Sequence, residues 1–149
     1  MSYAKGTSVP AERSRAELER ILANAKADQF ASGWVQGKAV ISFRLNNRMI
    51  RIEIPMPVLQ PPAPNWKQIK GLYYQQDKVD QETRRRWRAV ILYVKAKLES
   101  VESQIVSFED AFMSHIILPN GKTVGQNLIP QIKAAYEDGK MPPLLGYEG

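Results

Sequence analysis

The chain has 149 residues, a formal net charge of +6, and 21 Lys and Arg against 15 Asp and Glu. Its apolar content of 44% and charged content of 24% are ordinary for a globular protein, and we expect one domain over residues 1–149. The chain has no cysteine, which excludes disulfides, zinc–thiolate sites and thiol nucleophiles. No apolar run is long enough for a membrane span or a signal-peptide core, so we expect neither a membrane nor a secreted protein.

The N-terminal region reads as a flexible lead followed by a helix. We expect residues 1–8 to be flexible, with Ser8 as the helix cap. Leu18 and Leu22 recur at helical spacing, and the pattern predicts a first helix over Pro10 to Ala27.

The next segment changes its apolar period from 3.6 to 2, which is typical of strands. The stretches FASGWVQ, KAVISFRL and MIRIEI predict three strands, the last two joined by Asn46-Asn47. If Asn46-Asn47 forms a two-residue type I′ turn, Leu45 lies opposite Arg48 and one face of the hairpin is wholly apolar. Slipping by one residue would invert that face, so the register is strongly specified.

The other face of this hairpin is polar and carries Arg44 and Arg51. On an exposed sheet face these two arginines could bind phosphates. The alternative is that both are ordinary solvated charges.

Five prolines between residues 55 and 64 rule out a helix or a central strand there. We expect an extended connector over residues 55–66 and then a flexible loop to Val79. Aromatic and basic residues alternate in this loop, which suits single-stranded nucleic acid because rings stack on bases while lysines meet the backbone. The candidate residues are Trp66, Lys67, Lys70, Tyr73 and Tyr74. Alternatively, Trp66 and Tyr73 anchor the loop onto the core.

One long helix is predicted over Asp80 to Ser107. Apolar residues spaced three or four apart form a stripe along one face: Trp87, Ile91, Val94, Leu98, Val101 and Ile105. A second apolar strip opposite to it predicts cover on two sides, or a partner: Ala89, Leu92 and Ala96. The heptad-like stripe could seal a homodimer as easily as a core.

An arginine cluster lies in the first turns of this predicted helix. It consists of Arg84, Arg85, Arg86 and Arg88. We consider the cluster a candidate anion-binding edge, with solvated surface charge as the alternative.

The C-terminal third predicts two shorter helices. Ser107 is placed to cap the first, and Thr123 with Gln126 matches a capping box for the second, which Gly139 ends. We expect residues 140–149 to form an extended tail that lies over the core or docks on another chain.

The sequence carries no recognisable catalytic constellation. His115 is the only histidine, and neither a phosphate-binding GxxxxGK[ST] loop nor an HExxH motif occurs. We therefore expect no enzyme, no metal site and no cofactor.

Two stretches, VPAERSRAELERIL from Val9 and LPNGKTVGQNLIPQIKAAYEDGKMPPLL from Leu118, resemble a family of small phage and prophage proteins, as does the DQF–GW–VISFRL pattern between them. The family has no established activity, and the resemblance implies no catalytic residue. Its members tend to be encoded near replication and recombination functions. The resemblance therefore implies a phage accessory protein of the host cytoplasm.

Together these patterns predict an α+β fold: an N-terminal helix, a three-stranded antiparallel sheet, and a long helix with two shorter C-terminal helices packed on one sheet face. The leading functional hypothesis is a phage accessory protein that binds nucleic acid, foremost single-stranded DNA, in replication or recombination. It requires the arginines of the sheet and of the long helix to share one surface. The competing hypothesis is a protein-interaction module that inhibits or modulates a host or defence protein.

Overall fold

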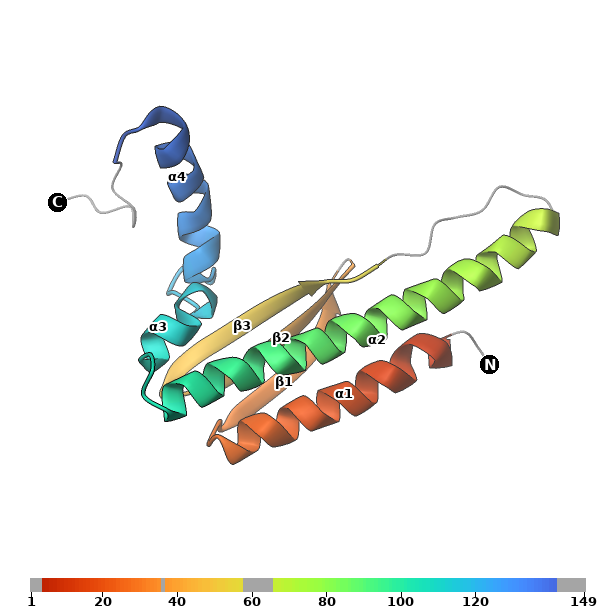
Figure 1. Ribbon diagram of the computed structural model, residues 1–149, viewed down its shortest axis with the longest axis horizontal. Coiled ribbons are helices and arrows are strands. Elements are labelled where there is room, and N and C mark those ends of the chain that lie inside the picture. The colour runs from red at the N-terminus through yellow and green to blue at the C-terminus, as the bar shows by residue number, and fades with distance from the viewer. Residues whose placement is uncertain (1–3, 36, 58–65, 142–149) are drawn as a thin grey trace.

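The computed structural model describes the backbone of residues 4–35, 37–57 and 66–141, and the side chains of residues 12–35, 37–57 and 76–141. Figure 1 shows the arrangement of the elements. In chain order they are α1 (Ala4–Asn24), β1 (Gln29–Val35), β2 (Lys38–Leu45), β3 (Arg48–Pro55), α2 (Trp66–Glu102), α3 (Phe108–Phe112), the 3-10 helix η1 (Met113–His115) and α4 (Val124–Asp138). The predicted α+β fold and its element order are confirmed.

The three strands form an antiparallel sheet in the order β1-β2-β3. Asn46 and Asn47 both adopt positive φ, 52° and 60°, as a type I′ turn requires. Leu45 pairs with Arg48, so the predicted register is confirmed. The apolar face of the hairpin is the buried one.

The hydrophobic core lies between this apolar face and the helices. α1 and α2 run side by side across the sheet (Figure 1). The rings of Phe43 on β2 and Phe112 on α3 meet edge to face, with their centroids 6.2 Å apart. Each large apolar side chain that is fully buried contributes about 1.5–3 kcal/mol before entropy is subtracted. The most deeply buried large side chains are Phe43, Phe112, Leu18, Leu22, Ile41, Ile50 and Val94.

Both long helices begin earlier than the sequence predicts. α1 begins at Ala4 and not at Pro10, so the predictions of a flexible lead and of a cap at Ser8 are wrong over the described part, residues 4–8. α2 begins at Trp66, so the predicted loop up to Val79 is helical. This segment is rich in Lys and Gln, which favour helix without adding to the apolar period that the prediction followed.

The longer α2 changes the setting of the arginine cluster and of the apolar strips. Arg84 lies several turns inside the helix, away from the positive end of its dipole. The helix ends at Glu102, before the predicted Ser107, and Ile105 is exposed beyond it. Leu92, in the second apolar strip, is also exposed, so the sheet and α1 cover α2 on one side only.

The caps of the two shorter helices follow the prediction. The Asp110 N–H donates to Ser107 Oγ at 3.0 Å, and Thr123 and Gln126 form the full capping box of α4. Gly139 ends α4 with a φ of 72°. The predicted connector and tail lie largely outside the described residues.

α4 takes a different place from the one expected for it. It projects away from the body formed by the sheet and the long helices (Figure 1). Its first turn bonds to Arg51 and Glu53, whose side chains lie on the polar face of the sheet. The start of α4 therefore docks on the face opposite to the one that α1 and α2 cover.

Candidate nucleic-acid interface

The guanidinium group of Arg44 is already hydrogen-bonded to a carboxylate, that of Asp28. Its Nε donates to Asp28 Oδ1 at 2.9 Å and its Nη2 donates to Asp28 Oδ2 at 2.6 Å. These hydrogen bonds from Arg44, assisted by its positive charge, hold the pKa of Asp28 below its usual range. A phosphate would have to compete with a bidentate partner that is already in place.

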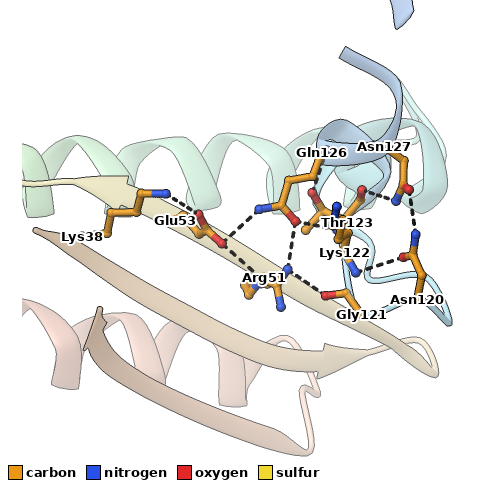
Figure 2. A network of polar contacts seen from close by, with 9 residues as sticks. All are labelled: Lys38, Arg51, Glu53, Asn120, Gly121, Lys122, Thr123, Gln126 and Asn127. Carbon is orange, nitrogen blue, oxygen red and sulfur yellow. Dashed lines mark hydrogen bonds and ion pairs between the residues drawn. The ribbon is translucent and has the colours of Figure 1, made fainter. Parts of the chain in front are cut away.

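Arg51 is the centre of a polar network that joins β3 to the start of α4 (Figure 2). Its Nη2 donates to the Gly121 carbonyl at 3.0 Å and to Gln126 Oε1 at 2.9 Å. Its buried Nε lies 3.4 Å from Glu53 Oε2, without hydrogen-bond geometry. With 23% of its side chain exposed, Arg51 holds the fold together and offers little to a ligand.

The same network extends in both directions from Glu53. Lys38 Nζ donates to Glu53 Oε1 at 3.2 Å, and Gln126 Nε2 donates to Glu53 Oε2 at 3.2 Å. Asn120 and Asn127 continue it across the turn before α4 (Figure 2). The sequence did not predict this network. The only bond of it that the sequence indicated was the capping-box contact between Gln126 and Thr123.

Two of the four α2 arginines share one carboxylate. Glu82 Oε2 accepts from Arg85 Nη2 at 2.5 Å and from Arg86 Nε at 2.7 Å, and these bonds lower the pKa of Glu82 to about 2. Arg86 also donates to the Pro55 carbonyl at 2.5 Å, so it faces β3. Arg85 stays exposed on the outer side of the helix.

Three of the other basic residues of α2 are available to a ligand. Among the described residues, none forms a hydrogen bond or an ion pair with Arg84, Arg88 or Lys95. A hollow of about 570 Å³ is lined by Lys78, Gln81, Glu82, Arg84, Arg85 and Arg88. We define the α2 basic strip as Lys78, Arg84, Arg85, Arg88 and Lys95. At about 1.5 Å per residue, it spans about 26 Å of helix.

The structure does not bring all the predicted arginines to one surface. Arg44 and Arg51 belong to the polar face of the sheet. The α2 basic strip lies on a helix that covers the opposite face. The expectation of one continuous basic surface across sheet and helix is therefore wrong. Among the described residues, the predicted arginines without a partner, Arg84 and Arg88, both lie on α2.

The aromatic and basic residues expected in a loop belong to the first turns of α2 instead. Their side chains lie outside the described residues, but the helical register fixes their angular positions. At about 100° per residue, these positions and the α2 basic strip fall within one arc of about 140°. The positions are Trp66, Lys67, Lys70, Tyr73 and Tyr74.

His115 has a packing role in the structure. The Tyr93 hydroxyl lies 2.7 Å from His115 Nε2, and Lys97 Nζ lies over the Tyr93 ring. Burial and, second to it, the charge of Lys97 lower the pKa of His115. Within the described ranges, no three His, Asp or Glu side chains are grouped to hold a metal ion.

The described part of the chain also contains no helix with the length and apolar character needed to cross a bilayer. No protein-family model matches the chain, and neither a curated protein nor a solved structure shows significant similarity to it.

Proposed function

We propose a narrower site than the shared surface of sheet and helix that the sequence hypothesis required: the protein binds nucleic acid along one flank of α2 alone, with single-stranded DNA as the first candidate ligand. One observation carries the proposal. On the surface of α2, the α2 basic strip and the aromatic and lysine positions of the first turns share one sector of about 140°, and the strip follows directly after those positions along the helix.

The charges of the strip suit a phosphate backbone. Arg84 and Arg88 have no partner among the described residues, so a phosphate need not displace an acid from them. Glu82 neutralises part of the field, but it is shared between Arg85 and Arg86 and leaves the strip net positive. Lysine and arginine contacts of this kind give binding that weakens as salt rises.

The first turns of α2 favour single-stranded over duplex DNA as the proposed ligand. Unstacked bases can lie on aromatic rings, and each such contact contributes about 1–3 kcal/mol. Trp66 occupies a register position in line with Arg84, and Tyr74 falls between Arg88 and Arg85. Tyr73 instead falls in line with the buried Ile91. By the resemblance to phage proteins, we place this binding in replication or recombination in the host cytoplasm.

The test is fluorescence anisotropy with single-stranded and duplex oligonucleotides over a salt series. The variant Arg84→Gln/Arg88→Gln/Lys95→Gln should weaken single-strand binding more than ten-fold. It should also reduce the slope of log affinity against log salt by about 2, since each lost phosphate contact removes about 0.7. Absence of binding at low salt, or binding indifferent to salt, would remove the proposal.

A matched control removes the same charge elsewhere. Lys122, Lys133 and Lys140 are exposed in and around α4, away from the α2 basic strip. Their triple change to Gln lowers the net charge equally and should leave the salt slope close to that of the wild type. Equal loss in both triple variants would mean that only net charge matters.

A second candidate function is protein interaction, favoured by the apolar surface of α4. Ile129, Ile132 and Tyr136 are exposed on this projecting helix, at spacings that place them on one side of it. Ile129→Glu with Tyr136→Glu should abolish the effect on a host or defence protein and spare DNA binding. If the double variant retains that effect, this candidate is rejected.

A further inference from the structure

The two edge strands of the sheet, β3 and β1, differ in whether another segment pairs with their outer side. The outer edge of β3 is partly covered, because Ile50 bridges to Ile116 and the Ile117 N–H donates to the Met49 carbonyl at 2.8 Å. Among the described residues, no segment pairs with the outer edge of β1. β1 therefore presents unpaired backbone donors and acceptors.

β1 also lacks the devices that usually protect a free edge. Its seven residues, QFASGWV, include no charged residue and no proline, both of which commonly block edge pairing. The side chains of Trp34 and Val35 are 58% and 57% exposed. A side chain added at Gly33 would meet no atom within 4 Å, so the sheet face is uncovered at this position.

The hairpin geometry identifies the free backbone groups. Val35 pairs with Lys38 across a two-residue connection, and such a flanking pair is hydrogen-bonded. Alternation along the strand then directs the N–H and C=O groups of Phe30, Ser32 and Trp34 away from β2. These three residues can form a new ladder without breaking any bond of the sheet.

We propose that β1 pairs antiparallel with β1 of a second copy of this chain, joining two sheets into one of six strands. An antiparallel pair centred on Ser32 has two-fold symmetry, the commonest symmetry of soluble dimers. It sets Phe30 of one copy opposite Trp34 of the other, an aromatic pair across the strands. On the other sheet face, Ala31 meets Gly33, and neither side chain obstructs the approach.

The charges beside the edge fit a second copy. Arg15 Nη1 donates to Ser32 Oγ at 3.4 Å, so the two-fold axis brings two Arg15 side chains near each other. Glu12 and Glu19 lie within about one turn of Arg15 on the same side of α1, and both are exposed. In a two-fold pair, the side of α1 that carries Arg15, Glu12 and Glu19 therefore faces the same side of α1 in the second copy.

Sedimentation velocity over a concentration series tests the pairing. The wild type should form a dimer, and Ala31→Lys, which adds a charge to the exposed edge, should raise the dimer dissociation constant at least ten-fold. Ala134→Lys, at an exposed site on α4, is the matched control and should dimerise like the wild type. A wild type that stays monomeric at about 100 μM overturns the proposal.

A second measurement ties any dimer to this edge. Amide hydrogen exchange at Ser32 and Trp34 should slow as concentration rises, while exchange at Ala31 and Gly33, already bonded to β2, should not change. Ser32→Pro removes an outward N–H and the hydroxyl that accepts from Arg15, but no hydrogen bond to β2. It should abolish dimerisation with little loss of secondary structure. A dimer that survives Ser32→Pro and Ala31→Lys uses another surface, and the proposal is then rejected.

This inference does not depend on DNA binding. Arg84→Gln/Arg88→Gln/Lys95→Gln should dimerise normally, and Ala31→Lys should still bind a single DNA strand. The two proposals can therefore fail separately.

Discussion

Arg51 on β3 donates a hydrogen bond of 2.9 Å from Nη2 to Oε1 of Gln126, which lies 75 residues further along the chain in α4. The same Oε1 accepts from the Thr123 backbone N–H, also at 2.9 Å. One amide side chain thus closes the capping box of α4 and fixes that helix to the sheet. A helix that projects from the body depends on this junction for its direction.

We therefore expect Gln126→Ala to loosen α4 at its base. The change removes the bonds to Arg51, Glu53 and the Thr123 N–H together and should cost about 1–2 kcal/mol of unfolding free energy. Denaturant unfolding measures this cost. Amide exchange in α4 should accelerate, while exchange in β2 should change little.

The control for this prediction is Gln131→Ala. Gln131 lies on the same helix, and its Nε2 donates a single bond to the Asn127 carbonyl at 3.1 Å. Gln131→Ala should cost a few tenths of a kcal/mol, as expected for a single side-chain bond between residues four apart on one helix. Equal costs for the two variants would contradict the assigned role of Gln126.

Among the single variants proposed, we expect truncation of Phe112 to cause the largest loss of stability. It is fully buried between the rings of Phe43 and Phe108, with centroid distances of 6.2 Å and 5.1 Å. Phe112→Ala should cost about 3–5 kcal/mol because a cavity remains where the ring was. Calorimetric or denaturant unfolding measures it. Met113→Ala, next in sequence and exposed, should cost well under 1 kcal/mol.

The sheet register was predictable from sequence because two local rules agree on it. The turn at Asn46-Asn47 accepts positive φ, and the alternation around it leaves only one register that buries a complete apolar face. The start of α2 was not predictable in this way. Its first turns carry apolar residues at helical spacing, Trp66, Ile69 and Tyr73, but they follow directly after the proline-rich connector and alternate with lysines. The prediction therefore extended the connector into a loop where propensity favours helix.

The candidate site likewise has one part that the sequence predicts and one part that it does not. Helical spacing alone places Arg84, Arg88 and Lys95 on one flank, and the structure adds that this flank faces away from β3 and α3. The occupation of Arg44 by Asp28 and of Arg51 by the α4 turn depends on contacts between distant segments. No local pattern in the chain encodes these two pairings.

Glu82 predicts a change of stability at acidic pH. Its pKa is about 2 in the folded chain and 4.5 without its partners, because Arg85 and Arg86 donate hydrogen bonds to it. A lowered carboxylate pKa stabilises the fold above the unfolded value, and this contribution is lost as pH falls from about 4.5 towards 2. The stability difference between wild type and Glu82→Gln should therefore shrink over that range.

NMR titration of the Glu82 carboxylate tests the cause directly. In Arg85→Gln/Arg86→Gln the hydrogen bonds are gone, and the midpoint should move up towards 4.5. A midpoint that stays near 2 in this double variant would show that the arginines are not responsible.

His115 predicts a second change of stability with pH, closer to neutrality. Burial and the nearby Lys97 charge lower its pKa from the ordinary 6.5, so the folded protein favours the neutral ring. The unfolded chain then binds the proton more readily, and stability should decline as pH falls below about 6.5. Thermal unfolding between pH 8 and pH 5 measures this, and His115→Gln should remove that part of the decline. Lys97→Met should move the NMR midpoint of His115 back towards 6.5, and a midpoint already at 6.5 in the wild type would contradict the assignment.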